Sequence, residues 1–421
     1  MDLRRLPEPS ADVPSDPDLL EAIRDEIRRD GPLTFARFME IALYDPARGY
    51  YRSPEARPGR AGDFLTAPEA HPIFGWAVAR FAGGVHAALG SPARFPIREL
   101  GAGEGALAAP LVTTLLRGGI GMPERLPRQV RYLVDEVDER RVAAVRERLA
   151  AANLPPGSVT VDADEGRPID GLILANEVLD ALPTHRVVQR GGALREVRVA
   201  LGDEDALVDV ETDPSSPDLG ARLADDGVTL ADGQRAEICL AVDAWIERVA
   251  AGLTRGVILL IDYGHPAADL YDGKRRAAGT LATYRGHRVG DDPFRSIGHQ
   301  DLTAHVDLTA VRRAADRAGL DHLVTTTQDA FLARLGIGDL LVAEQTRPGV
   351  TMQSYLETRS ALVRMIDPAA MGRFRVLAFG RGLPADVDIP GLRPVADAEP
   401  SADGAEGSAD DAGGSAPGAG G

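Results

Sequence analysis

A glycine-rich turn with acids on both sides is the first segment whose residue types could do chemistry. ELGAGEGA at 99–106 follows the apolar run FPIREL and contains the G-x-G-x-x-A spacing of a dinucleotide-binding turn. Glu99 and Glu104 argue against a pyrophosphate there, because they would place negative charge beside a dianion. Glu136, the next acid that could accept from a ribose, lies 35 residues beyond Gly101, whereas a dinucleotide site has this acid about 20 residues on.

A ligand with a positive charge and no phosphate fits both observations. S-adenosylmethionine has a sulfonium, an α-amino group and a ribose with two hydroxyls. Gly101 and Gly103 would let the backbone approach it closely, Glu99 could face the ammonium group, and Glu136 could accept from the ribose. Either acid alone could instead be a solvated acid at a strand end. The turn and both acids together predict a site for S-adenosylmethionine.

Polar residues also follow three later apolar runs. They are Asp162 and Asp164 after VTV, Asn176, Glu177 and Asp180 in ANEVLDALP, and Asp262 and Tyr263 in IDYG. In open α/β sheets ligands bind outside the carboxyl ends of the strands, so these side chains are expected to converge. Asp162 is placed where an adenine amino group could be met, although an acidic surface loop would look the same.

The elements that must position these residues alternate in type. Helical periodicity is expected at 73–89, 105–117, 140–152 and 242–253, between the short apolar runs FPIREL, RYLVDE, VTVDA, GLILANE and GVILLIDYG. This order predicts a mostly parallel sheet with helices on both faces, with later strands near 323–327 and at 376–380. The run THRVVQR-GG-ALREVRVAL predicts an added β-hairpin that turns at Gly191-Gly192.

Composition limits the partners. The chain has 47 basic and 64 acidic residues and a net charge of −17, which argues against non-specific binding to nucleic acid or anionic membranes. It has no run of about 18 apolar residues, so we expect no membrane span. The single Cys239 excludes a disulfide framework, has apolar neighbours and is expected to be buried and inert. We expect a cytoplasmic protein.

Six segments resemble the MidA-like family of class I S-adenosylmethionine-dependent methyltransferases. They are LTFARFMEIALYDPARGYY, GDFLTAPEAHPIFG, ELGAGEG, ANEVLDALP, IDYG and GTLATYRGH…DPF…GHQDLTAHVD, which run from about Gly31 to Val311. The family includes the mitochondrial protein arginine methyltransferase that assists assembly of respiratory complex I. One departure, VDEVDERR after the second strand, favours Glu136 as the ribose ligand and leaves Asp135 as the alternative.

The resemblance implies a Rossmann-like, doubly wound and mostly parallel sheet with an N-terminal helical region and an added hairpin subdomain. We expect the following division: a flexible N-terminus at 1–16, an N-terminal helical region with a cofactor-covering loop at 17–95, the methyltransferase domain at 96–382 with insertions at about 184–240 and 265–306, and a disordered tail at 383–421. The tail is clearest from Ala396 onward, where small residues and acids offer nothing to offset the entropy of ordering.

The resemblance further implies methyl transfer to a guanidinium nitrogen of a protein arginine, by analogy in a respiratory NADH dehydrogenase subunit. Residues and resemblance together give these candidates: catalytic Glu177, Asp180, Asp262 and His287; cofactor-binding Gly62, Asp63, Phe64, Thr66, Glu99, Gly101, Gly103, Glu136, Asp162 and Asn176; substrate-binding Tyr51, Glu69, Tyr263 and His305. No metal is expected.

The chemistry needs carboxylates because arginine is protonated at ordinary pH. Glu177 with Asp180, or Glu177 with Asp262, could clamp the guanidinium and stabilise its charge. Phe64 and Tyr50 or Tyr51 would exclude water from the cofactor, unless these aromatics only pack the core. His287 or His305 could act as a base or contact the substrate.

Two other functions stay open on the sequence alone. A non-catalytic assembly factor could keep the cofactor only as a structural ligand and use the hairpin near Gly191-Gly192 as its working surface. A methyltransferase acting on a small molecule is the third hypothesis. The expected partner is a protein substrate, the chain could form a homodimer, and nucleic acid is not expected.

Overall fold

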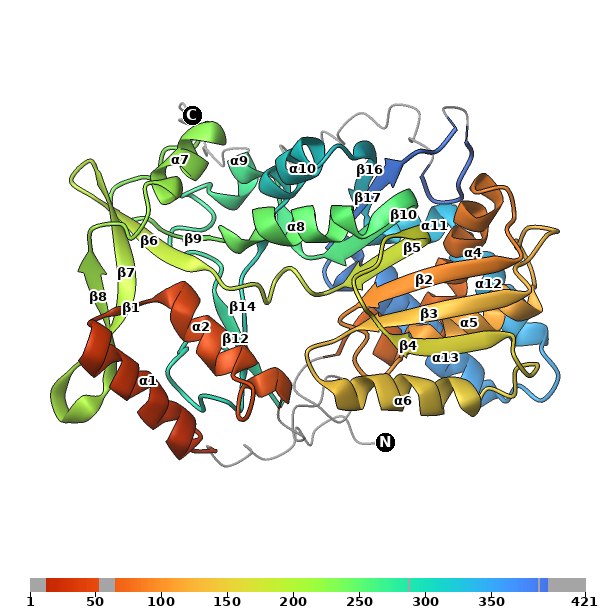
Figure 1. The fold of residues 1–421 in the computed structure, drawn as a ribbon, viewed down its shortest axis with the longest axis horizontal. Helices are drawn as coiled ribbons and strands as arrows, with labels where there is room; N and C mark the ends of the chain where they lie inside the picture. The colour runs from red at the N-terminus through yellow and green to blue at the C-terminus, as the bar shows by residue number, and fades with distance from the viewer. Residues whose placement is uncertain (1–12, 53–64, 287, 385–386, 393–421) are drawn as a thin grey trace, which may run out of the picture.

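The computed structural model describes residues 13–52, 65–286, 288–384 and 387–392, which form two lobes (Figure 1). One lobe contains a seven-stranded sheet between helices. The other contains a smaller antiparallel sheet with the two N-terminal helices, α1 (Pro17–Asp30) and α2 (Phe35–Tyr44). Segments distant in sequence therefore meet where the lobes adjoin.

The large sheet has the strand order β4-β3-β2-β5-β10-β17-β16. Its strands are β2 (Arg94–Leu100), β3 (Gln129–Asp135), β4 (Val159–Ala163), β5 (Ile169–Asn176), β10 (Leu253–Asp262), β16 (Asp321–Thr327) and β17 (Arg375–Arg381). Neighbours are parallel except at β17, which is antiparallel to both β10 and β16. The strand order reverses at β2, which pairs with both β3 and β5. This confirms the predicted doubly wound fold and creates a switch point where a crevice can open.

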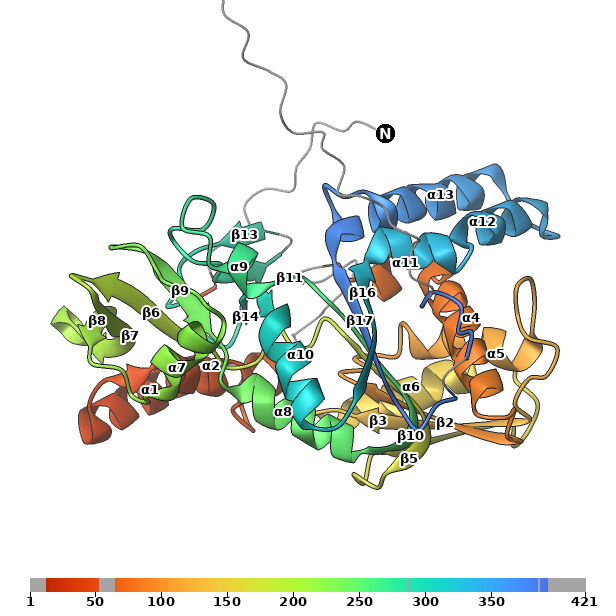
Figure 2. The same cartoon turned by 90° about the horizontal axis from the view of Figure 1, so that it is seen from above.

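Helices cover both faces of this sheet because its strands alternate apolar side chains toward each face. Leu172 and Leu174 of β5 pack with one group of helices, whereas Ile173 and Ala175 pack with the other. The first group is α4 (Ile73–Ala88), α5 (Ala108–Arg117), α6 (Glu139–Ala150), α11 (Gln328–Arg334), α12 (Ile337–Thr346) and α13 (Met352–Ile366); the second is α8 (Ala241–Ala251) and α10 (Leu308–Arg317) (Figure 2).

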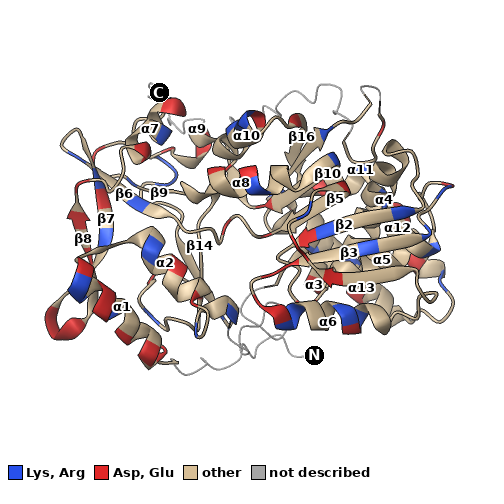
Figure 3. Ribbon diagram, in the orientation of Figure 1, with Lys and Arg blue, Asp and Glu red and all other residues tan. Residues whose placement is uncertain are grey.

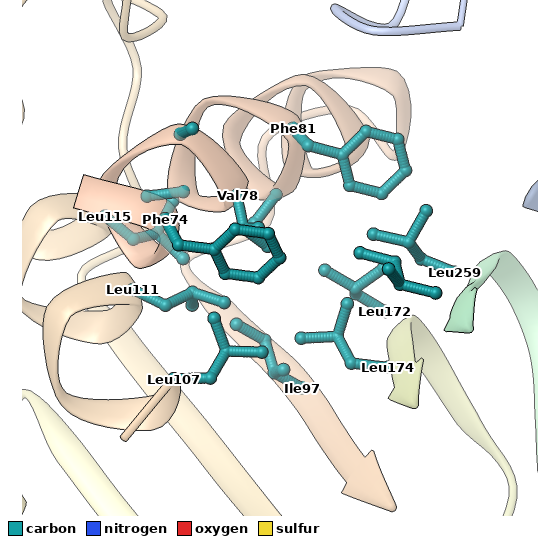
Figure 4. Packing of buried hydrophobic residues seen from close by; sticks show 14 of the residues in the cluster. Phe74, Val78, Phe81, Ile97, Leu107, Leu111, Leu115, Leu172, Leu174 and Leu259 are labelled. Carbon is teal, nitrogen blue, oxygen red and sulfur yellow. The ribbon is translucent and has the colours of Figure 1, made fainter. Parts of the chain in front are cut away.

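The core beside α4 holds the carboxyl ends of the strands in place. Phe74, Val78 and Phe81 of α4 face Leu172 and Leu174 of the sheet (Figure 4). Full burial of a leucine stabilises the fold by about 1.5–3 kcal/mol, so this layer is a rigid base for the site.

The smaller sheet contains the predicted hairpin. Its order is β1-β7-β6-β9, with β8 also pairing to β7, and the strands are β1 (Leu33–Thr34), β6 (His185–Arg190), β7 (Ala193–Leu201), β8 (Leu207–Thr212) and β9 (Arg235–Ile238). Gly191 and Gly192 both have positive φ, 56° and 85°, as a tight two-residue turn requires.

The predicted N-terminal region 17–95 contributes to both lobes. Helices α1 and α2 pack with β7 through Ile23, Phe35, Phe38 and Val199, whereas α4 packs on the large sheet. A local helical pattern does not show which sheet a helix covers. The N-terminal helices accordingly reach the site from the side opposite the large sheet.

The insertion after β10 supplies the remaining wall. It contains a three-stranded sheet of β12 (Ala282–Arg285), β13 (Arg288–Gly290) and β14 (Asp301–Thr303), and the strand pair β11 (Gly264–His265) and β15 (Val306–Asp307). The short elements are α3 (Ala67–Ala70), α7 (Asp218–Asp225), α9 (Ala267–Leu270), η1 (Tyr50–Arg52), η2 (Asp203–Asp205) and η3 (Met371–Arg373).

Parts of both predicted loose ends are ordered. Asp16 caps α1, and its N–H donates to Ile297 O at 2.9 Å. At the other end Ile389 is 1% exposed in the core, and Pro390 packs so closely on Gly84 that a Cβ there would lie 2.3 Å from it. Burial of the apolar Ile389 side chain offsets the entropy of ordering this segment, which the small and acidic residues further on cannot do. The expected start of the disordered tail at residue 383 is therefore too early. Residues 1–12 and 393–421 lie outside the described residues.

Candidate active site

A cavity of about 310 Å³ opens at the carboxyl ends of β2, β3 and β5. The glycine turn, Glu136 and Asn176 line it from the large sheet, and Tyr44 and Tyr51 line it from the N-terminal lobe. Figure 3 shows acidic residues gathered where these strands end toward the other lobe. The cavity lies at the switch point of the sheet, where the sequence predicted the cofactor.

The glycine turn has a backbone that only glycine adopts readily. Gly101 and Gly103 have φ of 67° and 53°. A Cβ on Gly101 would lie 2.8 Å from Val178, whereas a Cβ on Gly103 would meet nothing within 4 Å. The Gly103 N–H donates to Glu136 Oε1 at 2.5 Å, which joins the turn to the end of β3. The turn is therefore closely packed on one side and open on the other.

Of the two acids expected to contact the cofactor, Glu99 is buried and Glu136 is half-buried, so neither is a fully solvated acid at a strand end. Glu99 is 4% exposed and accepts from the Tyr132 hydroxyl at 2.5 Å. Burial raises the pKa of Glu99 to about 8 and that of Glu136 to about 7. A cation placed beside such carboxyls lowers their pKa and recovers the energy that burial costs them. The two carboxyl groups therefore suit a positively charged nucleoside such as S-adenosylmethionine.

The alternative ribose acid is already paired. Asp135 Oδ2 lies 2.7 Å from Arg248 Nη1. Glu136 is the acid that bonds the glycine turn, so it is the better ribose candidate.

The expected cofactor contact of Asp162 is not formed in the structure. Its side chain is 49% exposed and pairs with Arg131 at 3.3 Å, and it does not line the cavity. Asp162 pairs in register with Leu133, whose side chain packs on the α8 and α10 face, so it points away from the turn. Asp164 pairs with the buried Arg98 at 2.9 Å instead.

Glu177 lies in an unusual backbone conformation. Its φ is 54°, a left-handed value that costs a residue with a side chain energy, and its N–H donates to Ile261 O at 2.8 Å. Asn176 Nδ2 donates to Glu177 Oε1 at 3.1 Å. Burial first, then the nearby Asp180, raises the pKa of Glu177 to about 8. The strand end thus aims a desolvated carboxyl into the site.

Asp180 forms a pair with Tyr263. The Tyr263 hydroxyl donates to Asp180 Oδ2, while Asp180 Oδ1 is buried and has no hydrogen-bond partner among the described residues. Burial raises the pKa of Asp180 to about 6. One carboxyl oxygen is therefore oriented by the phenol, and the other is left for a donor.

Asp262 is also corrected, from a catalytic to a positioning residue. Its Oδ2 accepts from the N–H groups of Val178, Leu179 and Asp180 at 3.1, 2.8 and 3.3 Å, and its Oδ1 accepts from the Tyr263 N–H at 2.8 Å. It is 1% exposed and lines neither cavity of the site. Glu177 and Asp180 are therefore the carboxyl pair, and Asp262 holds the turn that carries them.

A second cavity, of about 390 Å³, adjoins the first at Glu177, which lines both. Asp180, Tyr263 and His305 line the second cavity with Glu177. The Tyr51 hydroxyl, beside the first cavity, donates at 2.9 Å to Asp301, which lines the second. The two cavities therefore share a wall of polar groups.

Tyr50 and Tyr51 were expected either to cover the cofactor or to pack in the core, and the structure places one in each position. Tyr50 is 1% exposed and packs in the core. Tyr51 lines the first cavity and stacks on Tyr44 with centroids 5.4 Å apart. Sequence reasoning missed Tyr44, whose hydroxyl donates to Ala181 O at 2.9 Å. Its place as the first residue of the segment YDPARGYY was the available signal.

Thr66 and Glu69 both line the first cavity, at the start of α3. Burial raises the pKa of Glu69, whose Oε2 lies 3.1 Å from Thr66 Oγ1. Glu69 therefore lies with the cofactor candidates rather than with the substrate candidates. Gly62, Asp63, Phe64 and His287 lie outside the described residues.

His305 is brought to the second cavity and is neutral. Its ring lies 5.4 Å from those of Tyr263 and His265, and burial lowers its pKa to about 4. Across the described ranges, no group of three His, Cys, Asp or Glu could hold a metal ion. No helix in the same ranges is long and apolar enough to cross a membrane.

Comparisons with known proteins agree with this geometry. Residues 77–326 match a family model described as an S-adenosyl-L-methionine-dependent methyltransferase. A crystal structure of a methyl transferase from Burkholderia thailandensis, bound to S-adenosyl-homocysteine, is 34% identical with a TM-score of 0.78, and the match covers 91% of this chain and 97% of that one.

Two curated relatives are mitochondrial enzymes by name. The protein arginine methyltransferase NDUFAF7 homolog of Drosophila melanogaster is 28% identical over 393 residues, 87% of this chain and 85% of the relative. The protein arginine methyltransferase NDUFAF7 of Homo sapiens is 26% identical over 400 residues, 86% and 82% of the two chains.

The strand order, the acid-flanked glycine turn and the cavity above it define a class I methyltransferase whose cofactor is S-adenosylmethionine. Within that class, the chain belongs to the MidA-like family of S-adenosylmethionine-dependent methyltransferases.

Proposed function

We propose that this methyltransferase acts on a guanidinium nitrogen of a protein arginine. The observation that carries the proposal is the carboxyl pair of the half-buried Glu177 and the buried Asp180, which line a second cavity that meets the cofactor cavity at Glu177. The names of the relatives in Drosophila melanogaster and Homo sapiens support the same acceptor.

The carboxyl pair suits a cationic acceptor. A guanidinium has five N–H donors in a fixed fork and stays protonated in water, so its site must both bind a cation and remove a proton. The free Asp180 Oδ1 can accept one N–H, and the Glu177 carboxylate can accept another. Asp180 is buried and Glu177 is half-buried, which strengthens these bonds because little water competes for them.

The bound cofactor supplies the methyl group; the protein supplies position and charge. Asp262 fixes the 178–180 turn, Tyr263 fixes Asp180, and Asn176 fixes Glu177. The guanidinium nitrogen is thereby held at the junction of the cavities while its proton passes to a carboxylate. Such alignment can supply a large share of the acceleration without a covalent intermediate.

The family resemblance supports a finer proposal, that the protein substrate is a subunit of a respiratory NADH dehydrogenase. From the sequence alone we further propose that the protein is cytoplasmic, where its free Cys239 would stay reduced. A homodimer is a further proposal, which sedimentation of the full chain tests directly.

Transfer of label from methyl-labelled S-adenosylmethionine to proteins of a cell lysate tests the function. We expect a labelled band whose hydrolysate contains methylarginine, and whose formation S-adenosylhomocysteine inhibits. Tight cofactor binding without any transfer would instead support the non-catalytic assembly factor. Label found only in small molecules would support a small-molecule acceptor.

A further inference from the structure

The second cavity has a basic end that methyl transfer to arginine does not explain. Arg276, Arg373 and Arg375 line it together with His265, although the chain carries a net charge of −17. We call these four residues the basic end. The carboxyl pair Glu177 and Asp180 is the acidic end of the same cavity.

No arginine of the basic end forms an ion pair with a carboxylate in the described part of the chain. Arg276 donates to neutral groups only, Asp269 O at 2.6 Å and His265 Nε2 at 2.7 Å. Arg375 Nε is buried without a hydrogen-bond partner in those residues. By contrast the neighbouring Arg275, outside the cavity, lies 3.6 Å from Asp272. The three guanidinium groups therefore have no direct ion pair among the described residues, although Glu177, Asp180 and Asp301 line other parts of the same cavity.

The two histidines of this region do not supply negative charge either. Burial, followed by the fields of Arg276, Arg375 and Arg373, lowers the pKa of His265 to about 4. His305 is neutral for the same main reason, and its Nδ1 is buried with no partner among the described residues. Both rings are therefore neutral hydrogen-bonding groups beside the guanidinium groups.

A chain of contacts connects the two ends of the cavity. The Tyr263 hydroxyl donates to Asp180 Oδ2, and the Tyr263 ring lies 5.4 Å from the ring of His305. The His305 ring lies 5.4 Å from that of His265, whose Nε2 accepts from Arg276. Two histidine rings and a phenol therefore separate the acidic end from the basic end. A ligand that satisfies both ends must carry a cation at one end and an anion at the other. An extended peptide offers this with two neighbouring side chains, because successive Cα atoms are about 3.8 Å apart.

We propose that the basic end binds the carboxylate of an aspartate or glutamate close to the target arginine, so that the enzyme selects acidic–arginine segments of its protein substrate. This inference rests on the proposed function. Guanidinium groups bind carboxylates in a bidentate manner, and hydrogen bonds to charged groups are worth about 1.5–3 kcal/mol, so the anion sets specificity as well as affinity.

Peptide binding to the enzyme saturated with S-adenosylhomocysteine tests the subsite without methyl transfer. The probes are seven-residue peptides with a central arginine and one aspartate placed at each of the two positions before and after it, each with an asparagine twin. We expect the aspartate peptide to bind at least about tenfold more tightly than its twin at one or more positions. Arg373→Gln lowers this ratio below about threefold, whereas Arg275→Gln keeps it.

Three outcomes would overturn the subsite. They are equal binding of every aspartate peptide and its twin, a preference that persists in both Arg373→Gln and Arg276→Gln, and a loss of S-adenosylmethionine affinity in Arg373→Gln, which would assign the guanidinium to the carboxylate of the cofactor. Adding S-adenosylmethionine separates the two proposals. An aspartate preference without arginine methylation refutes the function and keeps the subsite, whereas methylation without a preference refutes the subsite alone.

Discussion

The two cavities of the active site are built in different ways. The cofactor cavity uses residues at the carboxyl ends of parallel strands or just beyond them, such as Glu99, Gly103 and Glu136. The second cavity combines the turn after β5 with Tyr284, Arg373 and other residues from the insertion after β10 and from near β17. The first is therefore built mainly from the shared fold, and the second is where we propose that the protein substrate is recognised.

The largest expected effect comes from Glu177, the residue that lines both cavities, and it distinguishes their functions. Glu177→Gln removes a carboxylate that we propose binds the guanidinium and can accept its proton, so we expect methyl transfer to fall by about 10²–10⁴-fold. Binding of S-adenosylmethionine should change far less, because the first cavity keeps its turn and its other acids. Transfer of label and calorimetric titration measure the two effects.

Glu165→Gln is the matched control, because Glu165 is 62% exposed and lines neither cavity. An equal loss of cofactor binding and transfer in Glu177→Gln would place Glu177 with the cofactor rather than with the acceptor.

Asp262→Ala tests whether Asp262 stabilises the 178–180 turn rather than taking part in the reaction. The substitution leaves the N–H groups of residues 178–180 buried and unpaired, so we expect the free energy of unfolding to fall by about 3 kcal/mol. Asp262→Asn keeps an accepting oxygen and should lose less stability and retain measurable transfer. Denaturant unfolding with activity assays measures both variants. A fully stable but inactive Asp262→Asn would restore the catalytic role predicted from the sequence.

A pair of glycine substitutions tests the open side of the turn. Gly103→Ala and Gly192→Ala both place a side chain at positive φ with no atom within 4 Å, so each should cost about 1 kcal/mol of stability. Only Gly103→Ala puts a methyl group into the cofactor cavity, so its Kd for S-adenosylmethionine should rise about tenfold. If the hairpin variant shifted the Kd equally, the effect would not be local to the cavity.

The smallest expected effect is on the pH dependence of thermal stability. Burial raises the pKa of Glu99 from 4.5 to about 8 in the fold, so the folded state binds more protons than the unfolded state between these values. Stability from this group is present below its unfolded pKa and is lost as pH rises through about 8. We expect Tm of the free protein to fall from pH 5 to 8, and Glu99→Gln or saturating S-adenosylmethionine to flatten the slope. Thermal unfolding across this range shows whether it does.

Much of the fold could be predicted because its signals are local. Short apolar runs between helical segments predicted strands of the large sheet, and the Gly191-Gly192 pair predicted the hairpin. Position in a strand does not show where a side chain points, which is why Asp162, with its pairing set by the register to β3, was misplaced. Asp262 was misassigned because its four backbone donors come partly from a turn more than 80 residues earlier in the chain.

The sequence by itself determined the order of strands and helices, the glycine turn and the acids beside it, because those depend on neighbours along the chain. The tertiary structure decided which carboxyls are desolvated, that Glu177 adopts a left-handed conformation, and that Arg276 and Arg373 line the same cavity as the carboxyl pair. Burial and long-range charge depend on which distant segments pack together, and no local pattern encodes that choice.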